Sequence, residues 1–225
     1  MGAREFLEAR GVTRLCHFTK LQLLTHILSS DEGILASNSI RSDVKTVTDT
    51  DRYDGELQYV CCSIEYPNSW FLRQAQQRNS DQIFRDWIVL YIDLRILDYR
   101  DAKFCACNAG KSWGRYIFSD LNKLSTLYSS PTVLGRQRNS YMLECCPTDD
   151  QAEVLIKDSI PRTYITGIAV GNDDVAARVS SILTTYSILN KRIYVSPDVL
   201  NTNWSNIVRI GKRPNEILFE SREEE

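Results

Sequence analysis

The spacing of apolar and polar residues predicts a chain that mixes strands with helices. Strands are predicted over 15–18, 57–64, 87–92, 153–156, 165–170 and 192–195. Helices are predicted over 20–30, from 69 to about 77, over 117–128 and over 173–183, whereas 131–148 is polar and rich in turn residues. Because these elements do not alternate regularly as strand, helix and strand, we expect an α+β domain rather than a doubly wound sheet.

The 225-residue chain contains no stretch that resembles a linker, so we expect a single domain over residues 1–225. Its longest apolar run, at 87–92, is far too short to cross a bilayer, and residues 1–6 lack the apolar core of a signal peptide. These features predict a cytoplasmic protein that does not bind membranes.

The cysteines and the overall charge limit the kinds of site. The seven cysteines are an odd number and include the adjacent pairs Cys61-Cys62 and Cys145-Cys146, which predicts reduced, mostly buried thiols. Cys105-Ala106-Cys107 has no matching second pair and the chain has only two histidines, so no metal site is expected. A net charge of -2 argues against a broad nucleic-acid-coating surface but allows a local basic site.

One segment looks like part of a phosphate-binding loop. Asn108-Ala109-Gly110-Lys111-Ser112 resembles the tail of a P-loop, but the position of the first glycine is occupied by Cys105. The polar residues at 100–103 also indicate that no core strand leads into this loop. We therefore expect a surface turn, and the remaining glycines give no dinucleotide-binding pattern.

A carboxylate stands at the head of an apolar strand in Asp149-Asp150-Gln151-Ala152-Glu153-Val154-Leu155-Ile156. Alternate side chains of a strand share a face, so Gln151 and Glu153 are expected to point the same way. A carboxylate on a half-buried strand requires partners or a chemical role, which makes Glu153 a candidate for catalysis. The alternative is a solvated or ion-paired glutamate at a strand end.

Four separated motifs resemble the DarT family of ADP-ribosyltransferase toxins. They are His17-Phe18-Thr19, Arg52-Tyr53-Asp54-Gly55, Pro67-Asn68 and Gln151-Ala152-Glu153, in the family's order and rough spacing. The resemblance implies an ADP-ribosyltransferase-type fold of two small, highly twisted β-sheets packed together with flanking helices. It also implies NAD as a consumed co-substrate, a base in single-stranded DNA as the usual acceptor, a role as a bacterial toxin or phage-defence effector, and an antitoxin partner.

The resemblance gives roles to individual residues around NAD. Cleavage of the nicotinamide bond builds positive charge on the ribose, which a carboxylate such as Glu153 stabilises. Arg52 matches the family's essential arginine, and a guanidinium suits a pyrophosphate. The same resemblance places His17, Phe18, Thr19 and Asn68 in the NAD site. For Arg52 the alternative is a surface ion pair with nearby acids, and for His17 it is a structural histidine.

The acceptor is expected to meet Gln151 and the loop before the catalytic strand. Arg136 and Arg138 are candidates for phosphate contacts and Tyr141 for base stacking, whereas the alternative is a solvated loop with one aromatic anchor. Two other functions stay open, namely ADP-ribosylation of RNA or protein, and a non-catalytic module that binds a nucleotide or a partner. The presence of Glu153 argues against the last of these.

Overall fold

A computed structural model of the chain describes residues 1–40, 53–78, 86–188 and 190–220. Its main feature is a nine-stranded sheet in the order β11-β10-β9-β4-β1-β3-β7-β5-β6, with a separate two-stranded sheet of β2 and β8. Neighbouring strands are antiparallel except β10 and β9, which run parallel. The mixed arrangement agrees with the predicted α+β class.

The strands are β1 Leu15–Lys20, β2 Ile34–Leu35, β3 Tyr59–Ile64, β4 Trp87–Ile92, β5 Ala102–Cys105, β6 Ile117–Phe118, β7 Glu153–Lys157, β8 Ser159–Ile160, β9 Ile165–Val170, β10 Arg192–Val195 and β11 Ile217–Leu218. The α-helices are α1 Ala3–Glu8, α2 Leu24–Leu28, α3 Ser69–Arg78, α4 Ile96–Tyr99, α5 Asp173–Thr185, α6 Pro197–Leu200 and α7 Trp204–Arg209. Three 3₁₀ helices cover Leu21–Leu23, Leu121–Tyr128 and Arg162–Tyr164.

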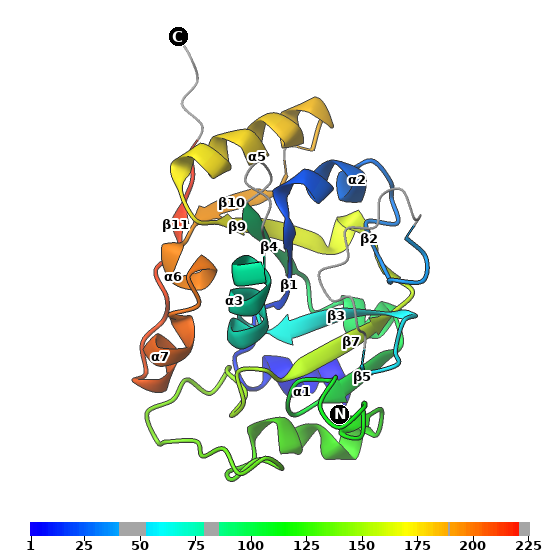
Figure 1. The fold of residues 1–225 in the computed structure, drawn as a ribbon, viewed down its shortest axis with the longest axis vertical. Coiled ribbons are helices and arrows are strands. Elements are labelled where there is room, and N and C mark those ends of the chain that lie inside the picture. Colours follow the sequence, from blue (N-terminus) through cyan, green and yellow to red (C-terminus); the bar gives the residue numbers. More distant parts are fainter. Residues whose placement is uncertain (41–52, 79–85, 189, 221–225) are drawn as a thin grey trace.

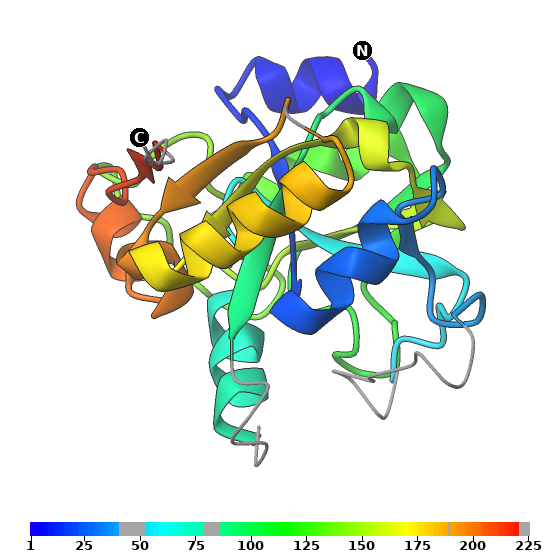
Figure 2. The same ribbon diagram turned by 90° about the horizontal axis from the view of Figure 1, so that it is seen from above.

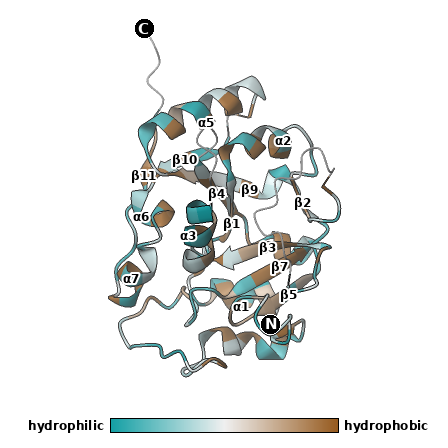
Figure 3. Ribbon diagram, in the orientation of Figure 1, coloured by the Kyte–Doolittle hydropathy of each residue, from teal (hydrophilic) through white to brown (hydrophobic). Residues whose placement is uncertain are grey.

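The strongest sequence patterns correspond to strands that have a neighbour on both sides in the sheet. The predicted strands over 87–92, 165–170 and 192–195 are β4, β9 and β10 with the same bounds. All six residues of β4 are buried, because this strand lies between β1 and β9. Figure 2 shows α5 lying across β10 and β9 on one side of the sheet. The hydropathy colouring separates the sheet from a surface helix: hydrophobic residues lie along β1 and β4, and hydrophilic ones lie on α3 (Figure 3).

Two predicted helices are shorter than expected. The helix over 117–128 is wrong at its start, because Ile117 and Phe118 form β6 and pair with β5, and Phe118 packs against Phe104 with ring centroids 6.0 Å apart. Between 20 and 30 the chain makes one 3₁₀ turn and then α2, which ends at Leu28.

Among the described helices, none combines the length and apolar character needed to cross a bilayer.

The expectation of two small packed sheets is wrong, because one continuous sheet joins both halves. β1 pairs with β4 over six residues, but with β3 only through Leu15↔Ile64 and Cys16↔Ser63. Figure 1 shows β3, β7 and β5 running at a steep angle to β1 and β4. Strong twist at this narrow seam gives two differently oriented halves without breaking the ladder. Beyond Cys16, β1 and β3 diverge.

Candidate functional site

A cavity of about 250 Å³ opens where β1 and β3 part. Its walls come from β1, α2, the segment 33–40, β3, the start of α3, the loop after β5 and the first residue of β7. The cavity follows from the fold, since strands that stop pairing after two residue pairs leave their next side chains facing a gap. His17, Phe18, Thr19, Asn68 and Glu153, all predicted site residues, line it.

Glu153 is buried in this cavity, with 6% of its surface exposed. It is the first residue of β7 and lies between Ser63 of β3 and Cys105 of β5 in the sheet. Its Oε1 accepts hydrogen bonds from Asn68 Nδ2 at 3.1 Å and from Asn108 Nδ2 at 3.0 Å. The backbone N–H of Ala109 donates to Oε2 at 3.3 Å. The alternative of a solvated strand-end glutamate is therefore wrong.

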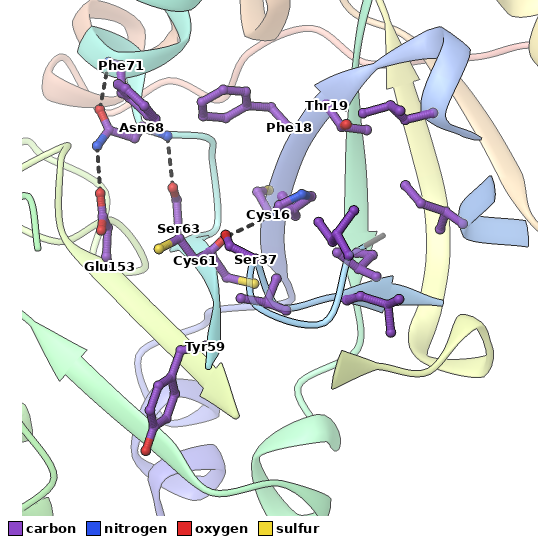
Figure 4. A pocket seen from close by; sticks show the side chains of 18 of the residues that line it. Cys16, Phe18, Thr19, Ser37, Tyr59, Cys61, Ser63, Asn68, Phe71 and Glu153 are labelled. Carbon is purple, nitrogen blue, oxygen red and sulfur yellow. Dashed lines mark hydrogen bonds between the residues drawn. The ribbon is translucent and has the colours of Figure 1, made fainter. Parts of the chain in front are cut away.

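Asn68 links the carboxylate to the start of α3. Its Oδ1 accepts from the backbone N–H of Phe71 at 2.9 Å, which is the bond of a helix N-cap. Its own backbone N–H donates to Ser63 Oγ at 2.9 Å, and the residue is 2% exposed. Figure 4 shows Asn68 between Phe71 and Glu153, with its two amide ends pointing in opposite directions. The helix cap thus fixes the amide that holds Glu153.

Asn108 is a site residue that sequence reasoning missed. No core strand was expected to lead into this loop because residues 100–103 are polar, yet Ala102–Cys105 forms β5 and pairs with β7 at Phe104↔Val154 and Cys105↔Glu153. This pairing brings the loop after β5 to the carboxylate. The expected turn over 108–112 is present and exposed at 111 and 112, but its base is buried against Glu153. Asn108 Oδ1 also accepts from the backbone N–H of Gly110 at 3.1 Å, which closes the turn. The apolar run 104–107 was the available signal for the strand.

The motif His17-Phe18-Thr19 lies on the wall formed by β1. The Nδ1 atom of His17 lies 2.9 Å from the carbonyl oxygen of Cys61, so its ring bridges the gap between β1 and β3. Phe18 packs against Phe71, with ring centroids 5.7 Å apart. Thr19 is 4% exposed and also lines the cavity.

Arg52 and Gln151 are not seen among the residues that line the cavity. Arg52 lies outside the described residues. Gln151 lies in a turn before β7, in which the backbone N–H of Ala152 donates to the carbonyl oxygen of Asp149 at 3.0 Å. Because β7 begins only at Glu153, strand alternation does not place Gln151 on the same face as Glu153.

The predicted acceptor loop is held by its own arginines. Arg136 Nε lies 3.0 Å from Asp149 Oδ2, and its Nη1 lies 3.5 Å from Asp150 Oδ1. Burial raises the pKa of Asp149, and Arg136 opposes that rise. Arg138 donates from Nη1 to the carbonyl oxygen of Cys146 at 2.6 Å. Tyr141, by contrast, is 76% exposed.

The cysteines do not form a metal site in the part of the chain that the structure describes. None of the seven is in a disulfide; six are buried and Cys61 is half-buried, which agrees with the expected burial of most of the thiols. The Sγ atoms of Cys105 and Cys107 lie 3.7 Å apart, but no cluster of three or more potential ligands exists among the described residues.

Comparisons with known proteins agree on one family. Residues 16–204 match the family model described as "ssDNA thymidine ADP-ribosyltransferase, DarT". The fold is similar to "Thermus sp. 2.9 DarT in complex with NAD+", with a TM-score of 0.62 at 20% identity over 83% of this chain and 96% of that one. The same Thermus protein with ADP-ribosylated ssDNA gives 0.62 at 18% identity over 84% and 96%.

A second organism gives a similar fold. The structure "Thermosipho africanus DarTG in complex with ADP-ribose" matches with a TM-score of 0.54 at 16% identity, over 84% of this chain and 51% of that one. No curated protein sequence matches the chain. At these identities the structural matches establish the fold.

Proposed function

We propose, since the chain belongs to the DarT family of single-stranded DNA thymidine ADP-ribosyltransferases, that Glu153 is the carboxylate at which it cleaves NAD. The family transfers ADP-ribose from NAD to thymidine in single-stranded DNA, so the chain is an NAD-dependent ADP-ribosyltransferase. The observation that carries the role of Glu153 is its position, buried in the cavity with N–H donors on both carboxylate oxygens.

The chemistry requires a carboxylate close to the nicotinamide-bearing ribose. As the C1–N bond breaks, the nicotinamide leaves with the bonding electron pair as a neutral molecule, and positive charge develops on the ribose. A fixed negative charge stabilises that state, and no acid is needed for the leaving group. The amides of Asn68 and Asn108 hold Oε1 of Glu153 in place before the substrate binds. We assign both asparagines as positioning residues.

The walls of the cavity suit the nicotinamide end of NAD. Phe18 and Phe71 provide an aromatic surface, while His17 and Thr19 provide polar atoms. Arg52 is retained as the proposed pyrophosphate clamp because a guanidinium forms paired hydrogen bonds with phosphate oxygens. These roles rest on the family motif and on the place of His17 and Thr19 in the cavity wall.

The acceptor step completes the transfer. Only one ring nitrogen of thymidine carries a hydrogen, so its attack on the ribose carbon forms the new C–N bond and releases one proton. We infer that Glu153 accepts that proton. Gln151 and Tyr141 remain proposed acceptor contacts. Arg136 and Arg138 also remain proposed phosphate contacts, although Arg136 already pairs with Asp149 and Arg138 donates to the carbonyl oxygen of Cys146. We further propose that the enzyme acts as a toxin with an antitoxin partner, which the DarTG name of the Thermosipho protein supports.

The test is a transfer assay with NAD and three acceptor pools. Single-stranded DNA oligonucleotides with and without thymidine, RNA and a protein mixture are incubated separately and their products weighed. We expect an ADP-ribose adduct on thymidine-containing DNA. Glu153→Gln keeps the shape of the side chain and its buried position but removes the charge, so it should lose the adduct while unfolding at a similar temperature. An adduct on RNA or protein alone would overturn the acceptor, and an active Glu153→Gln variant would overturn the mechanism.

A further inference from the structure

The loop that holds Glu153 also carries an exposed aromatic pair. After β5, residues 108–116 form successive turns, with backbone hydrogen bonds from Lys111 to Asn108 and from Trp113 to Gly110 at 3.0 and 3.3 Å. The indole of Trp113 meets Tyr53 edge to face, with centroids 5.1 Å apart and an interplanar angle of 89°. Trp113 is 79% exposed and Tyr53 51%. Two segments far apart in sequence therefore present one aromatic surface to solvent.

Core packing does not explain this arrangement. Trp113 and the preceding Ser112 have φ values of 58° and 52°, a left-handed conformation that side chains other than glycine seldom adopt. A strained backbone that holds a large apolar side chain in water is typical of binding sites rather than of the core. The strain is consistent with a ligand for Trp113.

The charge around the pair indicates the ligand. Lys111 and Arg115 stand two residues before and after Trp113, on the same turn-rich loop. Within the described chain neither forms an ion pair, so both cations are available to an anion. Aromatic rings flanked by cations are the usual grip on single-stranded nucleic acid, in which bases stack and phosphates meet the charges.

The aromatic surface continues into the cavity of Glu153. Asn108 and Gly110, at the base of the loop, line that cavity, and so does Asp54, the neighbour of Tyr53. A Cβ atom added at Gly110 would lie 3.5 Å from the Cβ of Tyr53, so the two segments are in close contact beside the cavity. A single DNA strand that brings one of its nucleobases to Glu153 therefore passes this aromatic surface.

We propose that Trp113 and Tyr53 form a stacking platform for a base next to the modified thymidine, with Lys111 and Arg115 contacting the adjoining phosphates. This inference rests on the proposed function, since it assumes a single-stranded DNA acceptor. It assigns acceptor binding to the loop after β5, in addition to the predicted contacts at Arg136, Arg138 and Tyr141.

The first experiment compares Trp113→Ala with the wild type in the transfer assay at saturating NAD. We expect the KM for a thymidine-containing oligonucleotide to rise about tenfold, the effect typical of removing one base–aromatic stack, with the KM for NAD unchanged. Trp113→Phe keeps a ring and should restore most of the affinity. Tyr99→Ala is the matched control, because Tyr99 is 57% exposed, stacks on Tyr164 and does not line the cavity.

A wild-type KM in Trp113→Ala, or an equal rise in Tyr99→Ala, overturns the platform while leaving the proposed function intact. If the wild type itself forms no DNA adduct, the proposed function fails first and the platform with it. If the wild type forms dimers that Trp113→Ala abolishes, and oligonucleotide binding is unchanged, the surface binds a second copy of the chain. That result also overturns the platform.

The second experiment tests the phosphate contacts by the salt dependence of oligonucleotide binding, measured by fluorescence anisotropy without NAD. A double variant that combines Lys111→Gln and Arg115→Gln should make the slope of log affinity against log salt concentration shallower by about 1.4. This is about 0.7 for each phosphate that no longer meets a cation. An unchanged slope overturns the role of the two cations.

Discussion

Asn68 and Glu153 are joined by a hydrogen bond of 3.1 Å between residues 85 positions apart in the chain. The same asparagine caps α3 through its Oδ1. The start of α3 and the candidate catalytic carboxylate are therefore held by the same side chain. A change at Asn68 should affect both stability and activity.

Asn68→Ala should lower the free energy of unfolding by about 1–2 kcal/mol, because it removes a helix cap and a donor to a buried carboxylate. It should also reduce kcat for ADP-ribose transfer. Asn172→Ala is the matched control, since Asn172 caps α5 by the same kind of bond to Val175 without contacting Glu153. Thermal unfolding and initial rates measure both effects. Equal losses of activity in the two variants would contradict the link to Glu153.

Asn108→Ala should lower kcat about tenfold while leaving the KM for NAD near its wild-type value, because the variant loses orientation of Glu153 rather than a substrate contact. Since Asn68 and Asn108 donate to the same oxygen, the double variant should show non-additive losses. Steady-state kinetics of the wild type, the two single variants and the double variant measure the coupling between the two asparagines. Strictly additive effects would show that the two amides act independently.

His17→Phe retains a ring but removes the 2.9 Å contact of Nδ1 with the carbonyl oxygen of Cys61. We expect the KM for NAD to rise about three- to tenfold, which corresponds to one hydrogen bond that holds β1 and β3 at a fixed separation. His17→Asn, which can still donate to the carbonyl, should lose less. If both variants bind NAD as the wild type does, the bridge has no role in the NAD site.

Arg136→Ala should destabilise the fold by about 1–3 kcal/mol at pH 7, because Asp149 is 1% exposed and would lose a charged partner. Burial already raises the pKa of Asp149, and removal of Arg136 should raise it further. The cost of the buried charge is present above that folded-state pKa and is relieved as the carboxyl takes up a proton below it. The difference between variant and wild type should therefore shrink as the pH falls from 7 to about 4.

Denaturant unfolding at several pH values measures this difference. Arg95→Ala serves as the control and should change stability little, because Arg95 is 67% exposed in its pair with Asp93. If Arg136→Ala leaves stability unchanged and instead raises the KM for the oligonucleotide, Arg136 serves the acceptor, as the sequence predicted.

Periodicity in the sequence located β1, β3 and β7, the strands that carry the site, to within two residues at each end. β4 and β9 have longer apolar runs, and such runs have few alternatives to a buried strand. β5 was missed because only its last two residues are buried, and Ala102–Cys105 becomes a strand by pairing with β7, about 50 residues later. The sequence pattern around 102–105 does not show that β7 will pair with this segment.

The residue types and their order determined the family and the head-of-strand carboxylate. Four short motifs and one acid before an apolar run made Glu153 the candidate catalytic residue, because a charged group in that position needs a specific environment. The family match over residues 16–204 confirmed the resemblance.

The tertiary structure decided which groups surround that carboxylate. Asn108 reaches Glu153 across 45 positions and Asn68 across 85, and both contacts depend on the path of the sheet rather than on local sequence. The narrow seam of two residue pairs between β1 and β3 decided where the cavity lies. Hydrogen bonds act only over about 3 Å, so they are fixed by the assembled fold and not by spacing along the chain.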